Sequence, residues 1–210
     1  MSASSTPIVI TGATGHLGRL IVESLLARGV APDQLVAAGR NAEKLAELET
    51  LGVRTARIDY TDPDGLAAAF AGADKVMLVS SSEVGHRVAQ HSAVIDAAVA
   101  AGVKHLIYTS APAATTSALI LAPEHKATEE YLVASGIPFT ILRNGWYTEN
   151  YIQTAQQGGE SGTIASSAGE GRVASASRKD YADAAAVVLT TAGHDGKVYE
   201  LSGDTAWSFH

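Results

Sequence analysis

The sequence predicts an α/β fold in which a doubly wound parallel sheet carries helices on both faces. Five successive helical patterns each end at a glycine, and an apolar strand follows each of these glycines. The five glycines are Gly29, Gly52, Gly72, Gly102 and Gly136. Short apolar runs that alternate with helices are typical of repeated βα units, whose strands lie parallel because each helix crosses back over the sheet.

The individual elements follow from apolar runs and helix-capping residues. The predicted strands are apolar segments at residues 8–10, 35–38, 53–58, 76–79, 105–109, 139–142 and 198–201. Asn41 caps the second helix, and Asp62 followed by Pro63 begins the third. Later helices are predicted over 84–101, 123–135, 148–157 and 178–191. Gly158 and Gly159 are expected to end the helix over 148–157, and residues 207–210 look like the approach to another helix.

Three glycines follow the first strand, at positions 12, 15 and 18. Gly12 permits a sharp exit from the strand, Gly15 lets the backbone approach a pyrophosphate, and Gly18 lets the next helix pack closely on the sheet. The free amides at the start of that helix favour a bound anion. A strand before the glycines and an amphipathic helix after them predict a dinucleotide-binding turn. The alternative is a tight strand-to-helix turn that binds no ligand.

The residue that selects the cofactor in such a fold lies about 20 residues beyond the glycine turn. An Asp or Glu there accepts hydrogen bonds from the ribose hydroxyls of NAD(H), whereas this chain has Arg40. A guanidinium is permanently charged, and its planar fork suits a 2′-phosphate. Lys44 adds positive charge one helical turn further on, and Asp59 and Tyr60 are expected to border the adenine. We therefore predict NADP(H) as the cofactor; the alternative is that Arg40 is a solvated loop residue.

Two further segments follow strands that end at the same edge of the predicted sheet. In a doubly wound sheet the first and fourth strands are neighbours, and the ligand lies in the crevice where their connections diverge. Ser80, Ser81 and Ser82 follow the fourth strand, so we expect them opposite the glycine turn, near the nicotinamide ribose. The segment 143–147 follows the sixth strand. For the serines, the alternative is a polar loop with a helix cap.

Composition excludes several classes of function. The chain has 210 residues, a formal net charge of −7 and no cysteine, which removes disulfides, thiolate metal sites and cysteine nucleophiles. The negative charge and the lack of a basic tract disfavour nucleic-acid binding, because phosphate contacts supply much of that affinity. No apolar run is long enough to span a membrane, and residues 1–7 do not resemble a signal peptide. We therefore expect a cytoplasmic protein with no nucleic-acid, membrane or metal partner.

A nicotinamide enzyme needs a fixed cofactor, a pocket over one face of the nicotinamide and sometimes a proton donor. Many short-chain dehydrogenases use a Tyr with a Lys four residues later, and none of the seven tyrosines here has that partner. Two interpretations remain. One is hydride transfer to an acceptor that needs little acid assistance, such as a quinone. The other is a protein that binds NADPH without turning anything over.

Seven strings make a family resemblance specific. They are ITGATGHLG, AAGRNAEK, SSSEVG, YTS, LRNGWYTENY, ASASRKDYA and GKVYELSGD. Together they resemble the NmrA-like branch of atypical short-chain dehydrogenases, and within it the bacterial NADPH-dependent quinone reductases. The similarity extends over the whole chain, and SSSEVG with LRNGWYTENY is much more specific than the glycine turn.

The resemblance implies roles for particular residues. The pyrophosphate is expected at Gly12, Ala13, Thr14, Gly15, His16 and Leu17, and the 2′-phosphate at Arg40. The nicotinamide and the substrate are expected at Ser80, Ser81, Ser82, Asn144, Gly145, Trp146 and Tyr147. Similar enzymes pass hydride directly to the quinone, without flavin.

The candidate catalytic residues are His125, Lys126, Asn144 and Tyr147. A related branch, similar to isoflavone reductase, has a Lys near the position of His125. Either His125 or Lys126 is therefore a candidate to orient the nicotinamide ribose or to supply a proton. The alternative is a solvated pair on a helix face, and Tyr147 and Trp146 are expected to be pocket walls more than acids.

The resemblance also sets the expected domain organisation. We expect an NADP(H)-binding Rossmann domain over 1–150 and a partial substrate-side lobe, packed on it, over 151–210. Family members continue for several tens of residues beyond this sequence and build a lobe over the nicotinamide, so the lobe here is expected to be truncated. Both a shortened chain and a naturally minimal version fit this pattern. Either leaves an open pocket and exposed apolar surface, which favours a homodimer.

Three functional hypotheses follow. The leading one is an NADPH-dependent oxidoreductase that transfers hydride directly to a quinone, or to a similar conjugated acceptor such as a dye, without flavin. The second is a catalytically weak NADP(H) sensor that acts through a protein partner. The third, a nucleotide-sugar epimerase or dehydratase, is disfavoured by the missing Tyr–Lys pair.

Overall fold

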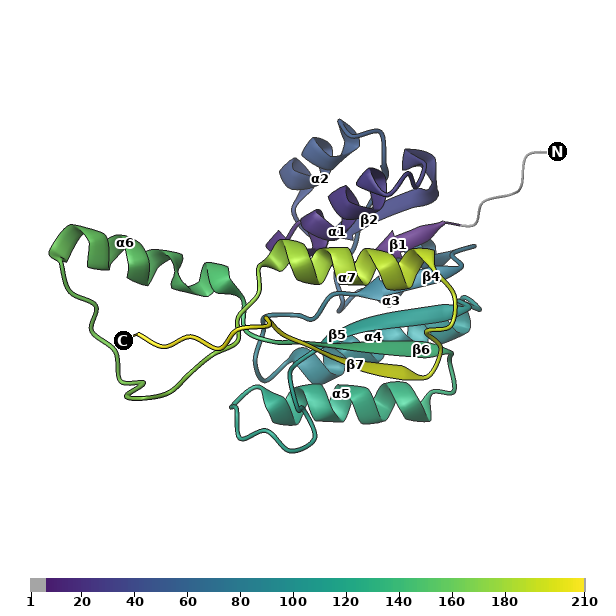
Figure 1. Cartoon of the computed structure of the whole chain (residues 1–210). Helices are drawn as coiled ribbons and strands as arrows, with labels where there is room; N and C mark the ends of the chain where they lie inside the picture. Colours follow the sequence, from purple (N-terminus) through teal and green to yellow (C-terminus); the bar gives the residue numbers. More distant parts are fainter. Residues whose placement is uncertain (1–6, 210) are drawn as a thin grey trace.

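The computed structural model describes residues 7–209, which form a seven-stranded parallel sheet (Figure 1). The strands are β1 (Ile8–Ile10), β2 (Leu35–Gly39), β3 (Arg54–Arg57), β4 (Lys75–Leu78), β5 (His105–Ser110), β6 (Phe139–Asn144) and β7 (Lys197–Leu201). Their order in the sheet is β3-β2-β1-β4-β5-β6-β7, and every neighbouring pair is parallel. The predicted doubly wound fold is confirmed, and β1 lies beside β4 as expected.

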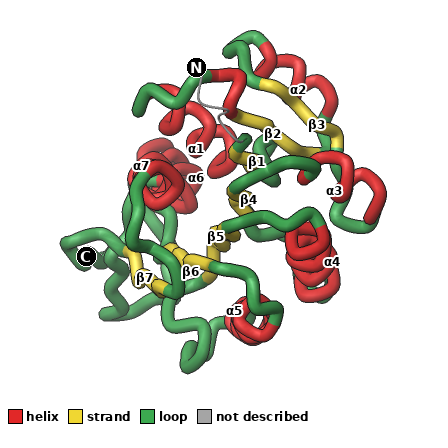
Figure 2. The backbone as a smooth tube through the Cα atoms, turned by 90° about the vertical axis from the view of Figure 1, so that its right-hand side faces the viewer, coloured by secondary structure: helices red, strands yellow, loops and turns green. Residues whose placement is uncertain are grey.

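Helices cover both faces of this sheet (Figure 2). The helices are α1 (His16–Ala27), α2 (Ala42–Glu49), α3 (Pro63–Phe70), α4 (Arg87–Ala100), α5 (Ala122–Ala134), α6 (Ile152–Ser161) and α7 (Arg178–Thr190), with short 3₁₀ turns η1 (Pro32–Gln34) and η2 (Thr148–Tyr151). Successive strand side chains point to opposite faces, so Ile10 joins the core under α1, α2 and α7 while Val9 joins the core under α3, α4 and α5. Two apolar cores therefore hold the sheet between two helical layers.

Helix boundaries follow the predicted capping residues. The side chain of Asn41 accepts a hydrogen bond from the Lys44 amide, and that of Asp62 accepts one from the Gly65 amide. The five helix-ending glycines named above all have positive φ angles, between 70° and 85°. Only glycine adopts this left-handed backbone easily, which is why these residues end helices and release the chain into the next strand.

The segment that follows η2 differs from the prediction. Gly158 and Gly159 lie inside α6, which ends at Ser161 with Gly162 in the left-handed conformation at φ 73°. A helical glycine costs only about 1 kcal/mol relative to Ala, so two of them do not by themselves stop a helix. Within residues 202–209 no helix follows β7; Trp207 pairs instead with Val173 in an isolated bridge. His210 lies outside the described residues.

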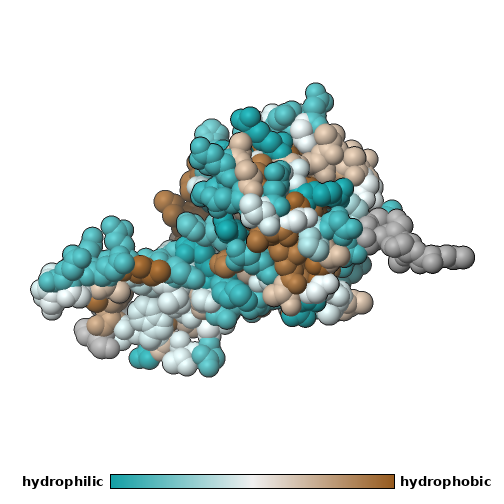
Figure 3. All heavy atoms as spheres, turned by 90° about the horizontal axis from the view of Figure 1, so that it is seen from above, coloured by the Kyte–Doolittle hydropathy of each residue, from teal (hydrophilic) through white to brown (hydrophobic). Residues whose placement is uncertain are grey.

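The chain beyond residue 150 does not form one separate lobe. β7 pairs with β6, and α7 packs along α1, where the Ser24 hydroxyl donates to Asp183 Oδ1 at 2.7 Å. Residues 152–176, which we call the arm, extend away from the sheet beside the C-terminal segment (Figure 1). The upper side of the arm is mostly hydrophilic (Figure 3). The expected division at residue 150 thus falls between β6 and β7 of one sheet, because β7 returns to pair with β6.

Candidate dinucleotide-binding site

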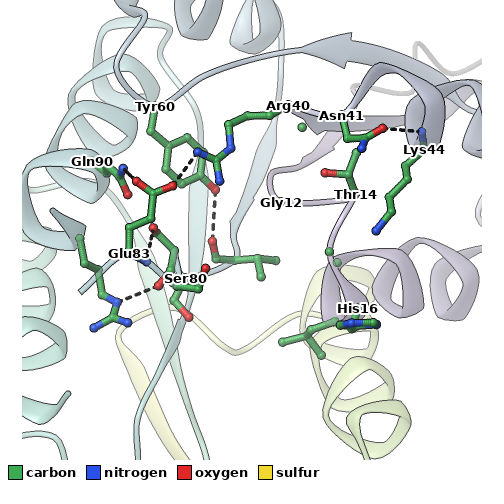
Figure 4. Close-up of a pocket in the computed structure, with 18 of the residues that line it drawn as sticks. Gly12, Thr14, His16, Arg40, Asn41, Lys44, Tyr60, Ser80, Glu83 and Gln90 are labelled. Carbon is green, nitrogen blue, oxygen red and sulfur yellow. Dashed lines mark hydrogen bonds and ion pairs between the residues drawn. The ribbon is translucent and has the colours of Figure 1, made fainter. Parts of the chain in front are cut away.

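A cavity of about 620 Å³ opens at the carboxyl edge of the sheet, beyond the ends of β1, β2 and β4 (Figure 4). The sequence-predicted residues that line it are Gly12, Thr14, Gly15, His16, Leu17, Gly18, Arg40, Lys44, Asp59, Tyr60, Ser80, Ser81, Ser82 and Tyr147. This position is the point where the connections of the neighbouring strands β1 and β4 diverge, which is where doubly wound sheets bind ligands.

The glycine turn forms one wall of the cavity. Gly12 has φ 62°, and its carbonyl accepts a hydrogen bond from the Gly15 amide at 2.9 Å. A Cβ atom on Gly18 would contact the Gly12 carbonyl oxygen and lie 2.8 Å from the Cα of Ala13. α1 begins here without a side-chain cap and without an acidic residue in its first turn. The turn therefore presents a close backbone cradle and a positive helix end, which fit a pyrophosphate.

Cationic side chains lie at the β2 end of the cavity. Arg40 follows β2, its side chain is 64% exposed, and Lys44 lies one turn along in α2. Tyr60 lies next to Arg40, and its hydroxyl donates to Thr11 Oγ1 at 2.6 Å (Figure 4). A Cβ atom at Gly39 would lie 2.7 Å from Thr14 Oγ1, so this corner admits backbone only. The arrangement fits an adenosine ribose that carries an additional phosphate.

Hydrogen bonds from α4, which is itself paired with α5, hold the serine segment in place. The Ser81 amide donates to His91 Nε2 at 2.9 Å, and the Ser81 carbonyl accepts from Arg87 Nε at 2.8 Å. Arg87 in turn forms an ion pair of 2.6 Å with Glu124 of α5. Burial lowers the pKa of His91 to about 3, so its ring stays neutral and its Nε2 stays an acceptor. These contacts fix the backbone of the loop that faces the glycine turn.

Tyr147 and Arg178 form the opposite end of the cavity. The Arg178 guanidinium lies over the Tyr147 ring, 4.8 Å from its centroid, and the Asn144 amide donates to the Tyr147 hydroxyl at 3.5 Å. Burial is the main cause that raises the pKa of Tyr147. A phenol with a raised pKa is a poor acid, so the ring acts here chiefly as a wall.

Three of the four candidate catalytic residues do not line the cavity: Asn144, which lies behind Tyr147, and His125 and Lys126 on α5. His125 is buried on α5, with Nδ1 2.6 Å from the Tyr108 hydroxyl, and burial lowers its pKa to about 4. Lys126 lies on the exposed side of α5, 3.9 Å from Glu130. The geometry gives no support to His125 or Lys126 as a proton donor, because α5 turns one into the core and the other toward solvent.

Four other predicted site residues lie behind or beside the cavity wall. The Ala13 amide donates to the Ala38 carbonyl at 2.9 Å, so it belongs to the sheet edge. The Gly145 amide donates to the Leu201 carbonyl at 2.8 Å, and the Trp146 carbonyl accepts from Ala176 at 3.2 Å. Asn144 is buried behind Tyr147. In the segment after β6, Tyr147 lines the cavity, because Gly145 is hydrogen-bonded to β7 and Trp146 to the end of the arm.

Several lining residues were not singled out from the sequence. They are Glu83, Arg87, Gln90 and Arg178. Glu83 directly follows Ser80–Ser82, so the sequence itself indicates that Glu83 lies near the cavity. Arg87 and Gln90 face the site because α4 begins there, and Arg178 does so because α7 begins at the same edge. No local pattern in the sequence shows which face of a helix start meets the crevice.

Comparison with known proteins shows the family to which the chain belongs. A family model described as NAD(P)H-binding matches residues 12–192. Quinone oxidoreductase 2 of Escherichia coli is 52% identical over 201 residues, which cover 96% of this chain and 70% of that protein. Its crystal structure, described as NADPH-dependent and complexed with NADPH, aligns with a TM-score of 0.92 over 96% of this chain and 71% of the other.

Two further relatives place the chain within a wider group. Triphenylmethane reductase of Citrobacter sp., solved with NADP(H), is 40% identical with a TM-score of 0.92, over 96% of this chain and 72% of that one. An NmrA-like family domain-containing oxidoreductase of Aspergillus flavus is 30% identical over 94% of this chain and 66% of that protein. The chain therefore belongs to the NAD(P)H-binding family, in the NmrA-like branch that its sequence strings resemble.

Proposed function

We propose that this chain is an NADPH-dependent oxidoreductase that reduces quinones, or similar conjugated acceptors, by direct hydride transfer without flavin. The observation that carries the proposal is the cavity, in which a glycine turn and Arg40 face a serine segment across the β1–β4 switch point. Similarity to a quinone oxidoreductase and to a triphenylmethane reductase supports this class of acceptor.

The chain's own residues bind and orient in this proposal. The amides at the start of α1 hold the pyrophosphate, Arg40 with Lys44 holds the 2′-phosphate, and Ser80–Ser82 with Tyr147 border the nicotinamide. Bound NADPH supplies the hydride. A quinone that gains one hydride and one proton becomes a hydroquinone, and NADP⁺ is left. Quinone oxygens need little acid assistance, so we assign the proton to solvent in the open cavity.

We assign supporting roles to the remaining candidates. Asn144 positions Tyr147 through its amide, and His125 holds Tyr108 in the core beneath the serine segment. Lys126 is a surface residue paired with Glu130. A homodimer is also part of the proposal, supported by the exposed apolar side chains of Val84 and Ile120. Light scattering that gives only the monomer mass of 21.6 kDa would remove the dimer.

Steady-state NADPH oxidation by the flavin-free protein, with a panel of quinones and triphenylmethane dyes, tests the catalytic proposal. We expect NADPH consumption that depends on both protein and acceptor, with one hydroquinone formed per NADPH. Tight NADPH binding without turnover on any acceptor would contradict the proposal and favour a sensor that acts through a partner protein.

A further inference from the structure

The guanidinium of Arg40 is already engaged in this structure. Its Nη1 lies 2.6 Å from Oε1 of Glu83, which belongs to the loop between β4 and α4. The two side chains come from opposite walls and meet across the cavity in front of Tyr60 (Figure 4). The sequence lacks a carboxylate directly after β2, but the fold supplies one from the far wall.

Glu83 is held in place from its own side of the cavity. Its second oxygen, Oε2, accepts a hydrogen bond from Gln90 Nε2 at 2.8 Å, and its amide donates to Ser81 Oγ at 3.1 Å. The hydrogen bond from Gln90 and the nearby Arg40 lower the pKa of Glu83. The carboxylate is therefore ionised at neutral pH and aimed at Arg40 by a neighbour in the first turn of α4.

We propose that Glu83 is a specificity-determining residue, which competes with the 2′-phosphate of the cofactor for Arg40 and so limits the preference for NADP(H) over NAD(H). A phosphate monoester carries about two negative charges at neutral pH, so it must separate Arg40 from Glu83 and is repelled by the carboxylate that remains. A ribose with a free 2′-hydroxyl meets no such repulsion and finds in Glu83 a hydrogen-bond acceptor. This inference rests on the proposed role of Arg40.

Calorimetric titration with two fragments tests the inference without turnover. Adenosine 2′,5′-bisphosphate and adenosine 5′-monophosphate differ only in the 2′-phosphate, so the ratio of their affinities isolates that group. An exposed ion pair is weak, so Glu83→Gln is expected to raise this ratio by about fivefold, mostly through tighter binding of the bisphosphate. Glu43→Gln is the matched control, because it removes the same charge from an exposed position on α2 outside the cavity lining.

The Arg40→Gln background separates the inference from the proposal beneath it. The gain from Glu83→Gln is expected to disappear there, because the two anions no longer compete for one cation. Suppose that Arg40→Gln abolishes the bisphosphate preference while Glu83→Gln changes it no more than Glu43→Gln does. The competition by Glu83 is then contradicted, and the role of Arg40 in binding the 2′-phosphate stands. If Arg40→Gln leaves the preference intact, Arg40 does not bind the 2′-phosphate, and both conclusions fail.

Discussion

Tyr147 illustrates how the cavity uses a side chain for its shape. Its ring lines the cavity under the Arg178 guanidinium, while its hydroxyl is bonded to Asn144. We expect Tyr147→Phe to keep kcat for quinone reduction within about twofold, and Tyr147→Ala to raise KM by removing the wall. Steady-state kinetics with one quinone measures both. A loss of about 100-fold in kcat for the Phe variant, the size of a general-acid contribution, would contradict this role.

His125 gives the protein a predictable response to acid. Its folded-state pKa of about 4 lies below the value near 6.5 of an unfolded His, so the unfolded chain binds the proton first. The free energy of unfolding therefore falls as the pH falls from about 6.5 toward 4. At pH 5 this residue alone accounts for a loss of about 2 kcal/mol relative to pH 7.

Denaturant unfolding at pH 7 and pH 5 measures this effect. We expect His125→Gln to lose about 2 kcal/mol less than the wild type over that interval. Equal losses for the wild type and His125→Gln would contradict the buried neutral state. The sequence placed His125 on a helix, but its orientation depends on Tyr108 of β5, which no local pattern reveals.

At the scale of elements, the close packing of α1 on the glycine turn after β1 depends on Gly18. We expect Gly18→Ala to lower the free energy of unfolding by about 1–3 kcal/mol, because the added methyl group overlaps the Gly12 carbonyl. Gly159→Ala is the control, since a Cβ atom there meets nothing within 4 Å and Ala favours a helix. Unfolding midpoints measure both. A Gly18→Ala variant as stable as Gly159→Ala would contradict the close packing.

An ion pair between buried Glu129 and partly buried Arg143 joins α5 to β6. Arg143 Nη2 lies 2.6 Å from Glu129 Oε2, and the Ser110 hydroxyl donates to Glu129 Oε1 at 2.5 Å. We expect Glu129→Ala to cost about 2 kcal/mol of unfolding free energy, because it removes the acceptor of the Ser110 hydroxyl and leaves the partly buried Arg143 guanidinium with only the exposed Glu200, 2.8 Å away, as a partner. Its exposed neighbour is the control, and Glu130→Ala should change stability by less than 0.5 kcal/mol or so. Chemical denaturation measures the unfolding free energy of both variants. Similar small losses for Glu129→Ala and Glu130→Ala would contradict a structural role for the Glu129 ion pair.

Most elements were predictable because they depend on local signals. Asn41, Asp62 and the helix-ending glycines act within one turn of the chain, so the sequence alone placed the helices they begin or end. The prediction that the helix ends at Gly158 is wrong, because the low helix propensity of glycine does not by itself end a helix. The contacts of Val173 with Trp207 join distant segments, so the segment after β7 was equally hard to predict.

At the scale of the whole molecule, the sheet order and the place of the site follow from topology. The strand order of the parallel sheet reverses between β1 and β4, which brings Gly12, Arg40 and Ser80 to one crevice, as the sequence predicts. The sequence does not predict the ion pair between Arg40 and Glu83, because the two residues lie far apart in the chain and meet only in the folded structure. Arg178 was missed because the sequence does not show that α7 begins at this edge.

The central claim is that the Arg40 end of the cavity selects the dinucleotide with a 2′-phosphate, NADP(H), over NAD(H). Calorimetric titration of the wild-type protein with NADPH and with NADH tests it most directly. The account predicts that NADPH binds about tenfold more tightly, a difference of about 1.4 kcal/mol. Equal affinity, tighter binding of NADH, or binding of neither would contradict it.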